Sequence, residues 1–242
     1  MKIAEIYEIL NSVAPFEMQE NWDNSGLLLG EMNTQIKGKI YLSLDLDSDL
    51  IENAEEDSLF ITHHPLIFGA IKAINPLKFP GNLIYKMIKK NISLISVHTN
   101  FDKCVLNQFV ATKILGYEIY DKKDFLIFMR SPFESFSALC KDVKEKFELE
   151  NLRVTDSKKK IKTIAFCTGS GSELLDDLDI DCFITGDLKY HTALQSLENK
   201  ISLIDINHFE SERYFGLSLA PFLQKFKSQV IISNSKNPFQ YI

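Results

Sequence analysis

"FITHHPLIFG" (residues 60–69) joins an apolar run to two adjacent histidines and a proline. The run is typical of a β-strand, on which neighbouring side chains point to opposite faces. Pro65 also restricts His64 to an extended conformation. Either one ring is buried and the other solvated, or the strand has just ended and both rings turn toward one site. Two metal ions about 3.5–4 Å apart would accommodate both rings, one on each ion.

Outward from this strand, the chain alternates between strand and helix patterns. Ile3, Ile6, Tyr7 and Leu10 share one helical face, and an Asn-, Asp- and Gly-rich loop is expected at 21–30. Strands are then predicted at 39–47, 59–65 and 92–102, and helices at 48–57 (with Ser48 as the N-cap), 81–91 and 106–116. Further on, we predict strand, glycine loop and helix at 162–178, strand then helix at 182–200 and 201–226, and a last strand at 229–234.

This alternation predicts an α/β fold with helices on the faces of a parallel or mixed sheet. We expect two similar α/β lobes, at 1–120 and 161–242, that face each other as one functional unit. Residues 121–160 are expected to form a small strand–helix–strand insert and a hinge. The lysine-rich stretch 156–162 is the solvated part of that hinge.

Composition limits the class of protein. The chain has 242 residues, 45% of them hydrophobic, and a formal net charge of −6. This charge argues against nucleic acid as the main partner. No apolar run is long enough to span a membrane, and the first residues lack a signal-peptide pattern. Four scattered cysteines without a CxxC pair indicate buried thiols, so we expect a cytoplasmic protein. Core packing is the default expectation for Trp22.

All five histidines lie at or just beyond predicted strand ends, where open α/β sheets bind ligands. They are His63, His64, His98, His191 and His208. Carboxylates accompany them at a spacing of four residues: Asp102 after His98, Asp187 before His191 and Glu212 after His208. Imidazole nitrogens and carboxylate oxygens are ligands of zinc, manganese or iron. The three clusters together predict a site for two metal ions.

Each cluster also has a simpler interpretation. His208 and Glu212 would share one face of a helix, but a helix N-terminus favours acidic residues in any case. The stretch around His98 is also compatible with an ordinary polar loop. The glycine loop "TGSGS" (168–172) is either a phosphate cradle or a tight turn.

The motifs of this chain resemble those of the GTP cyclohydrolase 1 type 2 homologue family, also called NGG-interacting-factor-like proteins. The resemblance covers nearly the whole chain apart from the insert, and the motifs occur in the family's order. They are "NWDNSGLLLG" (21–30), "THHPLIFG" (62–69), "SVHTNFD" (96–102), "TGDLKYH" (185–191), "NHFESE" (207–212) and "NSKNPF" (234–239).

The resemblance implies a two-lobed α/β fold around a dinuclear centre, often in a ring-shaped homohexamer built as a trimer of dimers. It implies two divalent metal ions per chain, of zinc, manganese or iron. Five residues would be the ligands, with Asp102 and Glu212 as candidate bridges: His63, His64, Asp102, His208 and Glu212. His98 and His191 would lie close by, as a further ligand or as acid–base groups.

Two functions follow from these expectations. The first is a metal-dependent hydrolase that acts on a small molecule. It would open the imidazole ring of GTP or hydrolyse a related nucleotide or phosphoester, with His98 or His191 moving protons. The second is a non-enzymatic, oligomeric metal-binding adaptor or metal carrier, in which the same ligands stabilise a ring or store an ion.

Overall fold

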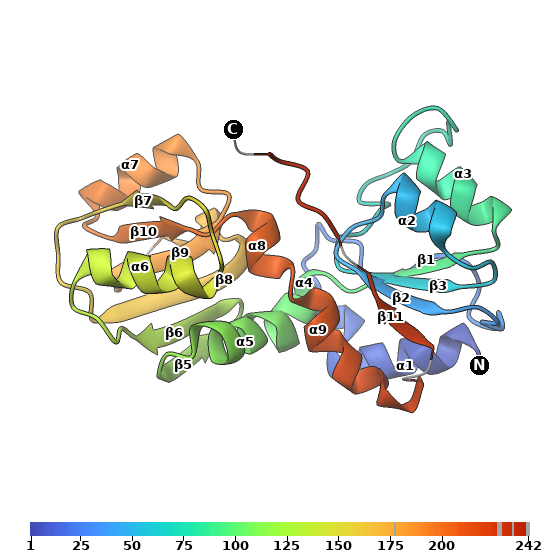
Figure 1. Ribbon diagram of the computed structural model, residues 1–242, viewed down its shortest axis with the longest axis horizontal. Coiled ribbons are helices and arrows are strands. Elements are labelled where there is room, and N and C mark those ends of the chain that lie inside the picture. The colour runs from blue at the N-terminus through green and yellow to red at the C-terminus, as the bar shows by residue number, and fades with distance from the viewer. Residues whose placement is uncertain (177, 227–228, 234, 241–242) are drawn as a thin grey trace. The chain divides into compact units, whose positions relative to one another are not determined.

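The computed structural model describes residues 1–176, 178–226, 229–233 and 235–240. The chain forms two compact units (Figure 1). Unit 1 comprises Met1–Val105 and Phe215–Ile242, and unit 2 comprises Leu106–Tyr214. Each unit contains one mixed β-sheet with helices packed on it, so the predicted α/β class is confirmed.

The sheet of unit 1 has five strands in the order β1-β4-β3-β2-β11. Their bounds are β1 Gly26–Leu29, β2 Ile40–Ser43, β3 Leu59–Thr62, β4 Ser93–Ser96 and β11 Val230–Ile232. Strand β1 is antiparallel to β4, whereas β4, β3, β2 and β11 run parallel to one another. In the pair β3–β4, Thr62 lies opposite Ser96, so these strands end side by side. The residues that follow them therefore meet at one edge of the sheet.

Helices cover both faces of this sheet (Figure 1). Their bounds are α1 Ile3–Val13, η1 Phe16–Met18, α2 Ser48–Asn53, α3 Gly81–Lys89, α4 Thr99–Phe101, α9 Phe215–Leu219 and η5 Ala220–Phe226. Ile3, Ile6 and Leu10 are buried on α1, as the spacing predicts. Asp47, not Ser48, caps α2, because its carboxylate accepts the Leu50 N–H at 2.8 Å while Ser48 is already helical.

Unit 2 has a six-stranded sheet in the order β5-β6-β8-β9-β10-β7. The strands are β5 Ile119–Lys123, β6 Leu126–Arg130, β7 Arg153–Thr155, β8 Thr163–Ser170, β9 Cys182–Gly186 and β10 Ser202–Asp205. The helices are α5 Asn107–Val110, η3 Ala111–Leu115, α6 Phe136–Lys146, η4 Ser172–Leu174, α7 Tyr190–Glu198 and α8 His208–Glu212. A π-helical turn, η2 (Asp102–Leu106), leads from α4 into α5. Strands β8, β9 and β10 are parallel, so β9 and β10 end at the same edge.

The bounds of the two units differ from the lobes expected at 1–120 and 161–242 with an insert at 121–160. The expected insert supplies strands of the unit 2 sheet, because β6 pairs with β8 and β7 pairs with β10. Residues 156–162 connect β7 to β8 within unit 2 and so are no hinge between units. After Tyr214 the chain returns to unit 1, where β11 pairs with β2.

Two local predictions were wrong. The expected loop at 21–30 contains strand β1, because its leucine run pairs with β4. The helix expected after the glycine loop is a single 3₁₀ turn at Ser172–Leu174.

Asp177 in that stretch and Asn234 in the closing motif lie outside the described residues. The four cysteines form no disulfide, and Cys167 and Cys182 are buried while Cys104 and Cys140 are partly exposed.

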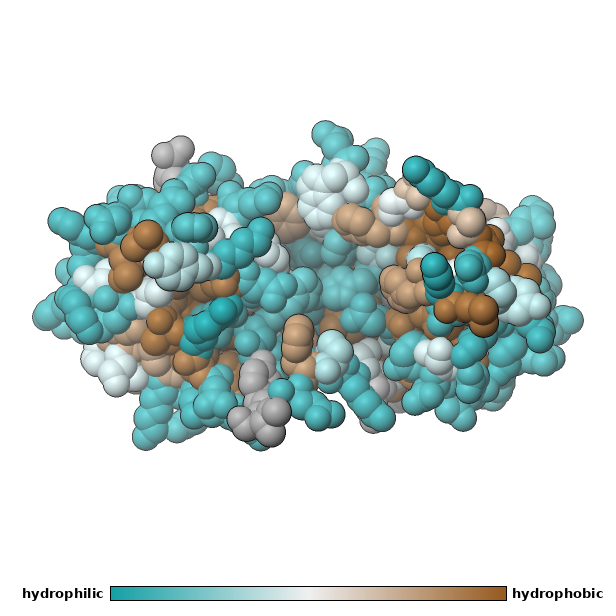
Figure 2. Space-filling view, turned by 90° about the horizontal axis from the view of Figure 1, so that it is seen from above, coloured by the Kyte–Doolittle hydropathy of each residue, from teal (hydrophilic) through white to brown (hydrophobic). Residues whose placement is uncertain are grey.

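Unit 1 exposes several large apolar side chains. Trp22, expected in the core, is 58% exposed because the adjacent Asp23 side chain occupies the buried position. Five more of them lie on the loop between β3 and α3: Phe68, Ile71, Ile74, Leu77 and Phe79. Figure 2 shows apolar surface over the part of unit 1 that carries this loop and α3.

Across the described residues, every helix is too short or too polar to traverse a lipid bilayer.

Candidate metal centre

His63 and His64 follow the last residue of β3 and turn toward the same place. Their ring centroids are 5.1 Å apart. The strand has ended at Thr62, whose hydroxyl hydrogen-bonds the Ser96 hydroxyl at 2.7 Å and donates to the His64 carbonyl at 2.9 Å. The alternation of a strand therefore no longer separates the two side chains.

A third imidazole joins them from the end of β4. The His98 ring lies 5.1 Å from the His63 ring and 5.5 Å from the His64 ring, measured between centroids. One nitrogen from each of the three rings lies within 4.8 Å of the others. The parallel pairing of β3 and β4 therefore brings three potential metal ligands together within unit 1.

Hydrogen bonds fix the orientation of each of these three rings. Nδ1 of each ring faces an oxygen that only accepts hydrogen bonds, so Nδ1 carries the proton and Nε2 of a neutral ring keeps its lone pair. The three acceptors are the Val97 carbonyl for His63 (3.0 Å), Asp45 for His64 (2.8 Å) and Asp23 for His98 (2.8 Å). This is the outer-shell arrangement that orients metal-binding histidines.

Asp23 is the most heavily bonded of these acceptors. It also accepts hydrogen bonds from the Thr99 N–H at 3.1 Å and the Thr99 hydroxyl at 2.5 Å. Burial alone would raise the pKa of Asp23, but the hydrogen bond and charge of His98 and the bonds of Thr99 hold it well below its usual value. Asp23 therefore stays ionised. Sequence reasoning missed this role, although Asp23 belongs to the motif at 21–30.

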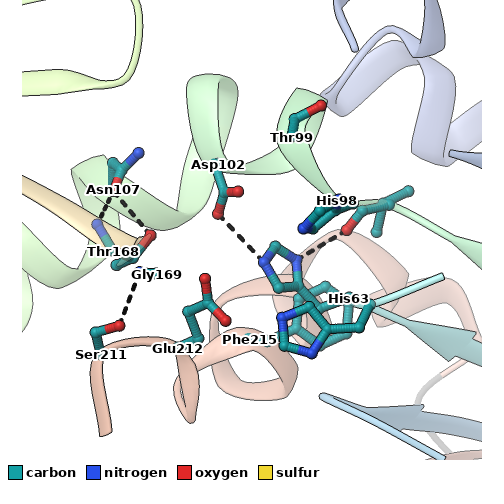
Figure 3. Close-up of polar contacts among 12 residues, drawn as sticks. His63, His98, Thr99, Asp102, Asn107, Thr168, Gly169, Ser211, Glu212 and Phe215 are labelled. Carbon is teal, nitrogen blue, oxygen red and sulfur yellow. Dashed lines mark hydrogen bonds and ion pairs between the residues drawn. The ribbon is translucent and has the colours of Figure 1, made fainter. Parts of the chain in front are cut away.

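Asp102 supplies an oxygen beside the same cluster. Its Oδ1 lies 3.3 Å from Nε2 of His63, and the side chain is largely buried. Figure 3 shows the two contacts of the His63 ring, one at each nitrogen. Phe215, whose ring centroid is 5.2 Å from that of His63, packs against the same imidazole. Unit 1 thus offers imidazole nitrogens and one carboxylate at a single place.

Unit 2 carries a separate pair of candidate ligands on α8. His208 begins this helix and Glu212 ends it, so the predicted spacing of four residues places both on one face, with Nε2 of His208 3.0 Å from Oε2 of Glu212. Nδ1 of His208 lies 2.7 Å from Asp187, in the same pattern as in unit 1. Burial lowers the pKa of His208, but Glu212 and Asp187 outweigh it and raise the pKa to about 9. An ion at Nε2 must therefore displace a proton.

The Glu212 carboxylate lies close against the glycine loop. A Cβ added to Gly169 would lie 2.3 Å from Oε1 of Glu212, and Gly169 has a φ of +64°. Figure 3 shows Glu212 beside this glycine. Three of the N–H groups of the loop are bonded to side-chain oxygens: Thr168 to Asn107, Gly169 to Ser211 and Gly171 to Thr185. These three bonds favour the tight-turn interpretation of the loop, and Gly169 leaves room there for the Glu212 carboxylate.

His191 has a different setting, at the start of a helix of unit 2. It is the second residue of α7, and its side chain is exposed beside Tyr190, with ring centroids 5.3 Å apart. The groups of potential ligands formed by the described residues do not include it.

The donor set fits a divalent transition metal. Neutral imidazoles with carboxylates suit zinc, manganese or iron, whereas magnesium prefers oxygen ligands. The fold and these donors define a mixed α/β protein with a candidate histidine–carboxylate metal site. The sequence profile of the Duf34/NIF3 (NGG1p interacting factor 3) family matches residues 1–238, and the chain belongs to this family.

Individual relatives agree with this assignment. The chain is 53% identical, over the full length of both proteins, to the "GTP cyclohydrolase 1 type 2 homolog" of Campylobacter jejuni. It is 41% identical to the "GTP cyclohydrolase 1 type 2" of Helicobacter pylori strain J99, over 99% of each chain. The fold is similar to the crystal structure of a Bacillus cereus protein related to NIF3, with a TM-score of 0.84, 17% identity, and 100% and 99% of the two chains covered.

Proposed function

We propose that this protein is a hydrolase that depends on two divalent metal ions. One observation carries the proposal: three imidazoles converge at the ends of β3 and β4, each with Nδ1 bonded to an acceptor, which leaves Nε2 as the nitrogen that would coordinate an ion. Orienting three rings in this way uses two carboxylates and a carbonyl. A purely structural cluster of histidines has no need of that arrangement.

We propose His63, His64 and Asp102 from unit 1, and His208 and Glu212 from unit 2, as the ligands, with His98 as a further one. Chain connectivity supports combining the two sets. Val105 is the last residue of unit 1 before the chain leaves it, and Tyr214 is the last of unit 2 before the chain returns. Asp102 and Glu212 each lie within about one helical turn of these crossing points.

Two such ions would lower the pKa of a bound water and polarise the bond that the water attacks. The residues of the chain have their own tasks. Asp23, Asp45 and the Val97 carbonyl keep the three rings of unit 1 in one tautomer. Gly169 leaves room for the Glu212 carboxylate. His191, exposed at the start of α7, is kept together with His98 as a candidate acid–base group, as the family resemblance implies.

The names of the relatives support a nucleotide as the substrate, with GTP as the first candidate. The reaction would begin with addition of water at C8 of the guanine base. Cleavage of the C8–N9 bond then opens the imidazole ring and transfers a proton to N9. The product keeps all atoms of GTP and of the water, and a second water would release the formyl group as formate.

The test is turnover by protein freed of metal with a chelator and reloaded with zinc, manganese or iron. We expect the guanine absorbance of GTP to fall only when the reloaded protein is present. Reloading should therefore restore the activity that chelation removes. A protein that binds the metals fully but converts neither GTP nor other nucleotides and phosphoesters would overturn the hydrolase. It would leave the metal-binding adaptor or carrier as the function.

We also propose self-association, as the homohexamer that the family resemblance implies. The exposed side chains of Ile74, Leu77 and Phe79 support it, because Leu77 is 89% and Phe79 73% exposed and such apolar surface favours association. Light scattering would measure the particle mass, and a monomer at all concentrations would contradict this part of the proposal.

A further inference from the structure

Two exposed aromatic rings lie beside the histidine cluster of unit 1. Trp22 is 58% and Phe68 53% exposed, and their ring centroids are 6.0 Å apart. The centroid of the His98 ring lies 6.1 Å from that of Trp22 and 6.4 Å from that of Phe68. We propose that this aromatic pair, Trp22 and Phe68, stacks on the planar heterocyclic base of the substrate. The inference deepens the proposed function and rests on it for the identity of the substrate.

Three consecutive residues fix the aromatic pair relative to His98. Trp22 precedes Asp23, whose buried carboxylate bonds Nδ1 of His98 at 2.8 Å. Asn24 then donates from its side-chain amide to the Ile67 carbonyl at 2.6 Å, one residue before Phe68. The segment that orients His98 therefore also anchors the loop that carries the second ring. A ligand on the two rings would lie next to the proposed metal ligands.

The hollow that Phe68 shares with Asp23 suits a base better than a phosphate. Phe68 borders an open hollow of about 560 Å³, together with Asp23, Asn24, Ile67 and the segment 69–71. This volume lies within the usual range for small-molecule sites, about 300–1,000 Å³. The described residues that border the hollow include a carboxylate and neither lysine nor arginine. A phosphate would therefore find no cationic side chain among these residues, whereas a flat, uncharged base can stack on the rings.

The chain provides its own probe for this contact, since Trp22 is its only tryptophan. The fluorescence of the zinc-loaded protein would be titrated with guanosine, GTP and ribose 5-phosphate, with excitation at wavelengths where guanine absorbs little. We expect saturable quenching by guanosine and GTP and none by ribose 5-phosphate. Zinc is used because it has no redox chemistry or absorbance that would quench the indole.

Phe68→Ala is the decisive variant because it removes one ring and keeps the fluorescent one. Loss of one stacking partner should weaken guanosine binding about tenfold. The matched control is Phe222→Leu, which changes another exposed ring of unit 1 and should leave guanosine affinity unchanged. Both sites are exposed, so both variants should fold. In a turnover assay, Phe68→Ala should raise KM and leave kcat nearly unchanged.

Several results would overturn the inference. These are quenching by ribose 5-phosphate, no quenching by guanosine, or equal guanosine affinity in the two variants. A fall in particle mass in Phe68→Ala alone would assign the rings to an interface between copies of the chain and would also overturn it. A different result would contradict the proposed function and leave this inference standing: guanosine quenches Trp22 in a Phe68-dependent way, but GTP is not converted. If Phe68→Ala converts GTP with an unchanged KM, this inference is contradicted and the proposed function is not.

Discussion

His63→Ala should lower the affinity for zinc more than about 100-fold, beyond the upper end of what changes to outer-shell partners cost. Nε2 of His63 lies 3.3 Å from Asp102, and its Nδ1 is bonded to the Val97 carbonyl. The ring is fully buried. Its removal deletes a proposed ligand, and His64 is the one other histidine directly after β3. Turnover should fall with metal occupancy. Competition with a chromogenic chelator would measure the affinity.

The control for this variant is His191→Ala. His191 is exposed on α7, outside the groups of potential ligands among the described residues, so zinc affinity should stay within about twofold of the wild type. Because removal of a buried ring also leaves a cavity, His63→Asn is a second variant that keeps a polar side chain. Equal zinc affinity in His63→Asn, His191→Ala and the wild type, with all three folded, would exclude His63 as a ligand.

Gly169→Ala should weaken metal binding at the unit 2 ligands and destabilise the fold. The new methyl group would lie 2.3 Å from Oε1 of Glu212, so the carboxylate must move. Alanine in the left-handed conformation at φ +64° adds about 1–2 kcal/mol of strain. Displacement of a ligand should cost at least about tenfold in metal affinity. Calorimetric zinc titration and chemical unfolding would measure the two effects.

Gly116→Ala separates these two effects. Gly116 has nearly the same backbone conformation, with φ +65°, but the nearest atom to an added Cβ is 3.9 Å away. It should therefore lose a similar free energy of unfolding, about 1–2 kcal/mol, and keep its zinc affinity. Gly69→Ala, where no atom lies within 4 Å, should be neutral in both assays. If Gly169→Ala binds zinc as tightly as Gly116→Ala, Glu212 is not a ligand.

The positions of His63, His64, His98 and His208 just after strand ends could be predicted because they depend on local sequence, whereas His191 lies inside α7. Apolar runs that end in a polar residue mark the ends of β3 and β4, and the helical spacing of His208 and Glu212 puts both on one face of α8. The orientation of the rings could not be predicted in this way. It depends on Asp23 and Asp45, which are distant in sequence from the histidines they bond.

The division into units was equally hard to predict. The pairing of β11 with β2 joins residues about 190 positions apart, and no local pattern signals it. Strands β6 and β7 have the same short alternating pattern as an independent insert, yet they extend the sheet of unit 2. Local sequence also gave the wrong environment for Trp22. Its apolar character suggested the core, whereas the side chain of its neighbour Asp23 takes the buried position.

The most direct test of the metal centre is the metal content of protein purified without chelators, measured per chain by elemental mass spectrometry. We predict about two equivalents of zinc, manganese or iron per chain, as expected for a two-metal hydrolase. Protein that contains none of these metals, and takes up none when each is added, would contradict the central claim that the converging histidines of unit 1 form a metal centre.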